Sequence, residues 1–281
     1  MKIVNTTSVY TPETDLLFAM KQMKTAGFRY LDLGGMGYRC EPENQHVFLT
    51  DQWEKWAYKI RDYAETEGLS FVQCHGVGWI STIAEHPDHI AYRVVDLAAM
   101  LGVRWLVMHP VEIKGRQEIC DDEFFAEQNA KWFTPFLQYC EARNVGLAIE
   151  NLPWPNANRV APLKSLVERL DSPNVGICWD TGHAHFNLLN GALLPEAIRA
   201  FGDKLVTIHA HDNLGDQDAH LIPGQGTYDW NGFMETLRTM NYQGDFVLEA
   251  HHQTQEASSE EERMALLIEM REAVEQILMT T

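Results

Sequence analysis

The sequence predicts an α/β protein of the (β/α)8-barrel class, with one domain over residues 1–281. Short runs rich in Val, Ile, Leu and Phe alternate with longer stretches of helical periodicity, the pattern of βα units around a parallel sheet. Eight such runs occur, whereas an open doubly wound sheet usually has about five to seven strands. A second observation agrees, because no G-x-G-x-x-G fingerprint of a dinucleotide-binding fold follows the first run.

The expected elements follow one another along the chain. Strands are predicted at residues 2–7, 28–34, 69–75, 104–110, 145–151, 175–181, 205–211 and 245–251. Several of these runs are apolar without alternation, which is typical of strands covered on both faces. Amphipathic helices are predicted at residues 11–27, 51–68, 88–102 and 121–144, the first starting at Thr11 and Pro12. Long segments at 35–50 and 212–228 are expected to rise from the same end of the barrel, where long loops tend to be functional.

Composition limits the classes of partner and the compartment. The chain has 22 Lys and Arg against 40 Asp and Glu, a net charge of -18, and this surplus repels phosphate backbones, so nucleic acid is not expected as a partner. Its five cysteines form no C-x-x-C pair, which argues against a disulfide framework and favours a reducing compartment. Without a long apolar segment, we expect a cytoplasmic protein with no membrane partner. A homo-oligomer is compatible with the exposed ends of a barrel.

Metal-ligand residue types occur where the expected strands end, and this is the end of a barrel that carries active sites. They are His75, His109, Glu150, Asp180, His209 and Glu249, with His183 one turn after Asp180. We favour Glu150, Asp180, His209 and Glu249 as the minimal set, because four consecutive strands let their side chains converge on one ion. Mixed imidazole and carboxylate ligands suit Mn, Zn, Fe or Co. His211 alternates with His209 along the strand, so we expect it on the opposite face and leave it out. His185, His251 and His252 are expected to support ligands or to lie at the surface.

Five motifs contain or adjoin these residues: IEN at 149–151, WDTGHAH at 179–185, IHAHDN at 208–213, HLIPGQGTYDW at 220–230 and LEA at 248–250. Together they resemble the xylose isomerase-like TIM-barrel superfamily of sugar phosphate isomerases and epimerases, over nearly the whole chain. The resemblance implies one divalent ion held by Glu150, Asp180, His209 and Glu249, with His183 reaching the substrate. Mn or Zn is favoured, with Co, Fe and Mg as the other choices.

The resemblance implies proton transfer at a carbon next to the carbonyl of a sugar or sugar phosphate. Glu150 and Glu249 would act as the acid and base on an enediolate; isomerisation, epimerisation and an inosose-type keto-cyclitol dehydration all stay open. Substrate contacts are expected from Trp79, Trp154 and Trp179, whose rings either pack on a sugar or fill the core. Lys114, Arg116 and Arg159 are the candidates to hold a phosphate. The arginine that ketose 3-epimerases are implied to carry after the strand-seven histidine is missing from 212–237, which leaves the sugar open.

The same residues are similar to those of endonuclease IV, an abasic-site nuclease with three zinc ions. A cluster of that kind would take its ligands from His75, His109, Glu150, Asp180, His183, His209, Asp218, His220 and Glu249. Charge argues against this alternative, because the two long segments carry the basic residue Arg39 against several acidic ones. His75, His109, Asp218 and His220 are therefore kept as additional metal or substrate ligands.

Overall fold

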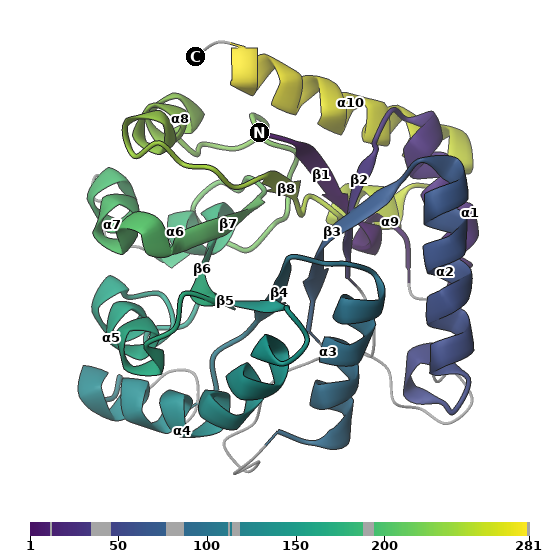
Figure 1. Ribbon diagram of the computed structural model, residues 1–281. Helices are drawn as coiled ribbons and strands as arrows, with labels where there is room; N and C mark the ends of the chain where they lie inside the picture. Colours follow the sequence, from purple (N-terminus) through teal and green to yellow (C-terminus); the bar gives the residue numbers. More distant parts are fainter. Residues whose placement is uncertain are drawn as a thin grey trace.

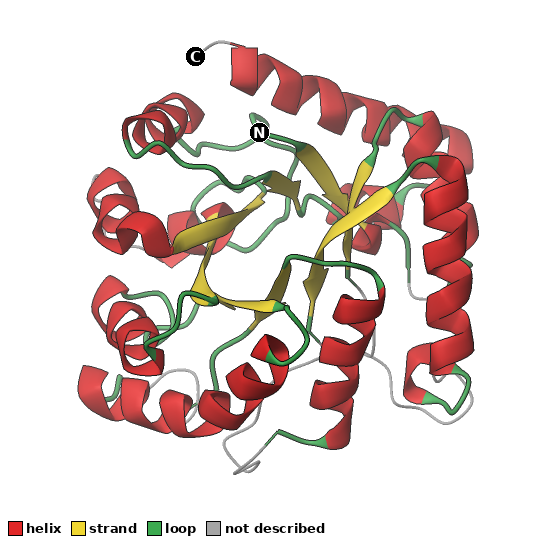
Figure 2. Ribbon diagram, in the orientation of Figure 1, coloured by secondary structure: helices red, strands yellow, loops and turns green. Residues whose placement is uncertain are grey.

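The computed structural model describes residues 1–11, 13–34, 46–76, 87–111, 113, 119–187 and 194–279. Its strands form one closed parallel barrel in the order β1 to β8, with helices outside it (Figures 1 and 2). The strands are β1 Ile3–Thr6, β2 Tyr30–Leu33, β3 Ser70–His75, β4 Trp105–Met108, β5 Gly146–Glu150, β6 Val175–Asp180, β7 Leu205–Ala210 and β8 Phe246–Leu248. The predicted fold class is confirmed, and each strand lies within its predicted run.

The four predicted helices are confirmed as α1 to α4, and the structure describes six more. The described helices are α1 Leu16–Thr25, α2 Trp53–Glu67, α3 His89–Met100, α4 Asp122–Glu141, α5 Val160–Leu170, α6 Thr181–Asn187, α7 Leu194–Phe201, α8 Trp230–Thr239, α9 His252–Glu256 and α10 Glu260–Met279. Helix α1 begins later than predicted, because the side chain of Asp15 accepts hydrogen bonds from the backbone N–H groups of Leu17 and Phe18. Helix α2 ends as predicted at Gly68, which takes the left-handed conformation that stops a helix (φ 66°).

The interior of the barrel is lined by small side chains below the strand ends. In parallel strands, paired residues point to the same face, and Ala148 pairs with Val107 while Cys178 pairs with Glu150. Val107, Ala148 and Cys178 form a buried cluster separate from the main core. This layer supports the polar residues that follow it at the carboxyl ends of the strands.

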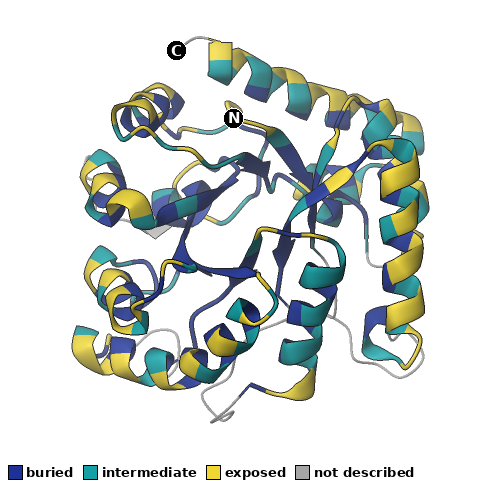
Figure 3. Cartoon of the chain, in the orientation of Figure 1, coloured by how far each residue is buried: buried dark blue, intermediate teal, exposed yellow. Residues whose placement is uncertain are grey.

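The main core lies between the outer face of the barrel and the helices, and the strands are buried almost throughout (Figure 3). Aromatic side chains of α4, including Phe133 and Phe136, are fully buried there with Phe246 of β8. Helix α10 closes the ring of helices, and its Arg271 donates a hydrogen bond to the carbonyl of Ala26 beside α1. Packing on this face holds the strands in register and so fixes the positions of the residues at their ends.

Candidate metal centre

Four strands bring the predicted minimal set together. Glu150 and Asp180 end β5 and β6, His209 lies near the end of β7, and Glu249 follows β8. The Nδ1 atom of His209 lies 3.0 Å from Oε1 of Glu150 and 3.2 Å from Oε2 of Glu249. It lies 4.0 Å from Oδ2 of Asp180. A single ion can therefore take one ligand atom from each of the four side chains.

Two more histidines bind the same glutamate from its other side. The Nε2 atoms of His75, at the end of β3, and His109, just after β4, each lie 3.1 Å from Oε2 of Glu150. Glu150 thus turns one oxygen toward His209 and the other toward His75 and His109, so its carboxylate belongs to two candidate ligand groups. A carboxylate with two oxygens engaged in this way is suited to bridge a pair of ions.

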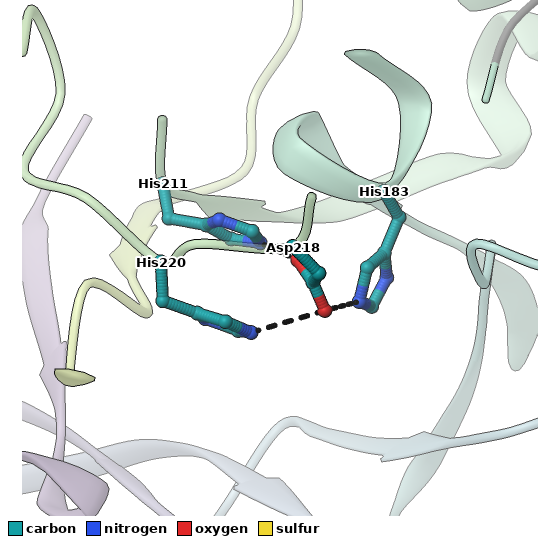
Figure 4. Close-up of side chains that lie close together, drawn as sticks. All are labelled: His183, His211, Asp218 and His220. Carbon is teal, nitrogen blue, oxygen red and sulfur yellow. Dashed lines mark ion pairs between the residues drawn. The ribbon is translucent and has the colours of Figure 1, made fainter. Parts of the chain in front are cut away.

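A third ligand group consists of His183, His211, Asp218 and His220 (Figure 4). The carboxylate of Asp218 lies between two imidazoles, 3.3 Å from Nε2 of His183 and 3.4 Å from Nε2 of His220. His220 has a positive φ of 44°, and its Nδ1 lies 2.8 Å from the carbonyl oxygen of Glu249. The loop after β7 therefore returns to the barrel mouth, as expected of residues 212–228.

The expectation for His211 was wrong. Side chains change face from one strand residue to the next, so residues two apart, such as His209 and His211, point to the same face. Its Nε2 lies 3.0 Å from Oδ1 of Asp180, and its ring stacks on His220 with centroids 3.9 Å apart. Gly182 makes this position possible, because a Cβ atom there would lie 1.9 Å from Cε1 of His211.

Buried amides orient several of these ligands, and sequence reasoning assigned them no role. Asn151 accepts a hydrogen bond from the backbone N–H of Asp180 at 2.7 Å, and its own amide donates to the Asp180 carbonyl at 3.0 Å. Its carbonyl oxygen lies 2.8 Å from Nδ1 of His183, and Asn158 donates to the His183 carbonyl at 2.9 Å. The signal for Asn151 was its place beside Glu150 in the IEN motif.

The charges of the centre shift one another's pKa values. Burial alone raises the pKa of Glu150, but His209, His109 and His75 surround it and hold its pKa well below its usual range. Burial lowers the pKa of His75, yet the Glu150 carboxylate outweighs it and raises the pKa to about 9. For His109, the effect of burial is larger than that of the Glu150 carboxylate, so its pKa is lowered.

In the third group, the pKa of His183 is set by the same balance of burial and nearby charge. Burial lowers its pKa, but the charge of Asp180 and the hydrogen bond and charge of Asp218 raise it to about 10. In the metal-free protein, such a ligand group contains a positively charged imidazole beside a carboxylate. Because a metal ion binds neutral imidazole, loading the centre must release these protons.

The remaining predicted substrate residues are placed elsewhere. Trp179 is wrong as a substrate contact, since it is fully buried and its ring packs against Phe201 of α7. The guanidinium of Arg159 pairs with Asp122 and donates to the carbonyls of Pro155 and Cys120, so the structure does not turn it to the metal ligands. Trp154 is half-buried against the main core. Trp79, Lys114, Arg116 and Arg39 lie outside the described residues.

The other histidines near the mouth have supporting positions. His251 and His252 lie against His220, with ring centroids 4.3 and 4.8 Å from it, and the three form a further possible ligand group. His185 pairs through Nε2 with the Thr227 hydroxyl at 2.9 Å.

A cavity of about 650 Å³ opens at the opposite end of the barrel, between Lys2, Arg104, Tyr242 and their neighbours. None of the ligand residues lines it. We therefore place the candidate site by its metal-ligand atoms, at the carboxyl ends of the strands, and not by the size of a cavity.

Among the described residues, no helix is both long and apolar enough to cross a lipid bilayer.

Comparisons with known proteins agree with the geometry. The family model described as xylose isomerase-like TIM barrel matches residues 20–270. A D-psicose 3-epimerase from Enterocloster bolteae is 39% identical over 245 residues, which cover 82% of this chain and 75% of that protein. Protein y4fM from Sinorhizobium fredii is 34% identical over 157 residues, or 53% of this chain, and the match spans about half of that relative, 47%. A crystal structure of the IOLI protein with a bound zinc atom has the same fold, with a TM-score of 0.73 at 16% identity over 99% of this chain and 98% of that one.

Proposed function

This chain belongs to the xylose isomerase-like TIM barrel family, and from that premise we propose that it is a metal-dependent epimerase or isomerase of a sugar or sugar phosphate. Its relatives include a sugar 3-epimerase, which supports the substrate class. The zinc bound by a protein of the same fold supports a divalent ion. Mn or Zn suits the mixed set of imidazole and carboxylate ligands best.

One observation carries the proposal: two carboxylates from separate strands approach the same imidazole nitrogen. Glu150 of β5 and Glu249 after β8 lie 3.0 and 3.2 Å from Nδ1 of His209. Glu150 is almost fully buried, whereas the side chain of Glu249 is 15% exposed. A substrate that enters from the barrel mouth would therefore meet Glu249 first and Glu150 beneath it.

This arrangement suits proton transfer at a carbon next to a carbonyl. A bound divalent ion would supply Lewis-acid stabilisation of the negative charge that develops on the sugar oxygens. Glu150 and Glu249 would exchange protons with the substrate carbon, one removing a proton and the other returning it. Return to the opposite face of the same carbon gives an epimer, and return to the neighbouring carbon gives the isomer. His183 would orient a substrate oxygen through its Nε2 atom, which faces Asp218.

The test combines metal analysis with hydrogen exchange. Ions per chain are counted for the wild-type protein, Glu150→Gln and Glu249→Gln, with Glu261→Gln as the matched control because Glu261 is exposed on α10. The wild type and the control should bind Mn or Zn and exchange substrate protons in D2O with members of a panel of free and phosphorylated ketoses and aldoses. Both site variants should lose exchange and bind metal more weakly.

The outcomes separate the related reactions. Products that keep the composition of the substrate establish isomerisation or epimerisation. Loss of water from a keto-cyclitol in the same assay would assign the dehydratase instead. A wild-type protein that binds no divalent ion would refute the proposal.

A second candidate function is favoured by three adjacent ligand groups: two of them share Glu150, and Asp180 of one contacts His211 of the third. A centre with three zinc ions would suit phosphodiester hydrolysis of the endonuclease IV kind. Three zinc ions per chain together with cleavage of abasic DNA would establish it. Proton exchange with a sugar and intact abasic DNA would exclude it.

A further inference from the structure

A glutamine inside the barrel lies against the nitrogen of His209 that faces away from the carboxylates. Gln73 belongs to β3 and is buried, with 2% of its surface exposed. Its amide nitrogen lies 2.8 Å from Nε2 of His209. Its amide oxygen accepts a hydrogen bond from the hydroxyl of Thr207 at 2.5 Å. The amide is thus enclosed between an imidazole and a hydroxyl from the opposite side of the barrel.

The orientation of His209 leaves one nitrogen for an ion. Nδ1 faces the carboxylates of Glu150 and Glu249, while Nε2 faces Gln73. A neutral imidazole that presents the lone pair of Nδ1 to an ion must carry its proton on Nε2. In a buried position that N–H needs an acceptor, because an unsatisfied buried donor is costly.

We propose that Gln73 is the positioning residue that supplies this acceptor and so makes Nδ1 of His209 the metal-binding atom. A half-turn of the Gln73 amide exchanges its oxygen and nitrogen and keeps both distances. In the turned form Nε2–H of His209 donates to Gln73, and the Gln73 amide donates to Thr207. The hydroxyl is able to pair with the amide in both orientations because it is both donor and acceptor.

A second neighbour of His209 does not replace Gln73 as the acceptor. Cys178 of β6 also lies against His209. Sulfur is a weak hydrogen-bond acceptor compared with an amide oxygen. Partners that orient a metal-bound histidine typically change metal affinity about 10–100-fold when they are removed.

The inference rests on the proposed metal-dependent function, and zinc affinity tests the two separately. Zinc binding is measured by competition with a chromophoric chelator for the wild-type protein, Gln73→Met, Gln73→Glu and Thr207→Val. Gln73→Met keeps the length of the side chain without an acceptor, and we expect about 10–100-fold weaker binding. Gln73→Glu restores an acceptor, and we expect it to recover most of the affinity.

Thr207→Val is the matched control, because it removes a hydrogen bond from the same pair and leaves the acceptor to His209 in place. We expect a change of less than about threefold in zinc affinity, since the hydroxyl serves both orientations of the amide. A purely structural role of the pair would weaken zinc binding in Gln73→Met and Thr207→Val alike. Nitrogen NMR of the zinc-loaded wild type should also show the His209 proton on Nε2.

The results lead to distinct conclusions. Tight zinc binding by the wild type with unchanged affinity in Gln73→Met would overturn the inference alone. A His209 proton on Nδ1 in the zinc-loaded protein would do the same. Absence of zinc binding by the wild type would overturn the proposed function and, with it, the role of Gln73.

Discussion

The folded conformation of the loop after β7 depends on one buried carboxylate. The variant Asp212→Asn tests how much stability this carboxylate contributes. Asp212 is fully buried. Its Oδ1 accepts from the backbone N–H groups of Asn213 at 2.9 Å and Tyr228 at 3.1 Å. Its Oδ2 accepts from the backbone N–H of Gly224 at 2.9 Å and the indole N–H of Trp230 at 2.8 Å. Every partner is a donor, so the site requires two acceptor oxygens.

The expected cost follows from this geometry. Asparagine replaces one acceptor oxygen with an NH2 group, so two of the four donors lose their acceptor whichever way the amide turns. A hydrogen bond to a charged group contributes about 1.5–3 kcal/mol, so the loss of two weakens the folded loop by roughly 3–6 kcal/mol. A penalty of this size favours local opening of the loop. Asp218 and His220 would then leave the third ligand group.

Two measurements on Asp212→Asn check the reasoning: the free energy of unfolding in urea and the number of zinc ions bound per chain. We expect a lower stability and, where the third ligand group binds zinc in the wild type, the loss of that ion. Asp216→Asn is the control, because Asp216 is an exposed acid of the same loop. A variant that stays within about 0.5 kcal/mol of the wild type, the range of ordinary surface substitutions, and keeps its full metal content would refute the role of Asp212.

Three further predictions concern the rest of the centre. In Gly182→Ala, the new Cβ would lie 1.9 Å from Cε1 of His211, so the free energy of unfolding should fall by about 1–3 kcal/mol, and an unchanged stability would contradict this contact. In the metal-free protein, the pKa of His75 is raised to about 9 and that of His183 to about 10. The stabilisation from these charged imidazoles is complete below the usual pKa near 6.5 and is lost as the pH rises through 9 to 10. The melting temperature of the metal-free protein should therefore fall from pH 7 to 10 more than that of the zinc-loaded protein, and equal slopes would disprove it. Trp179→Phe should lower stability by about 0.5–3 kcal/mol and leave KM unchanged. A raised KM would show that Trp179 contacts the substrate.

Much of the fold and of the ligand set followed from local patterns in the chain. The run VGICWDT predicts both β6 and the place of Asp180, because a buried parallel strand is a short apolar segment and a polar residue marks its end. The same reasoning placed Glu150 at the end of β5 and His209 near the end of β7, and the structure brings them together with Glu249. That the chain has one domain over residues 1–281 stays a prediction.

Two errors arose in the interpretation of side chains near the strand ends. His211 was expected to point away from His209, but residues two apart along a strand share a face, and His211 lies against Asp180. Trp179 was expected at the substrate because it adjoins Asp180, but alternation within β6 turns it toward the helices. For Trp179, nearness in sequence to a ligand therefore did not indicate nearness to the site.

Some contacts across the barrel had no local signal in the chain. Gln73 and His209 are 136 residues apart, and their nitrogens lie 2.8 Å apart. Asp218 reaches His183 and His220 because Asp212 folds the loop back on the barrel. Local sequence patterns predict where each strand ends and which residue stands there. Which side chains then share an ion, and which amide orients them, follows from closure of the barrel, because closure places residues from distant segments within hydrogen-bonding distance.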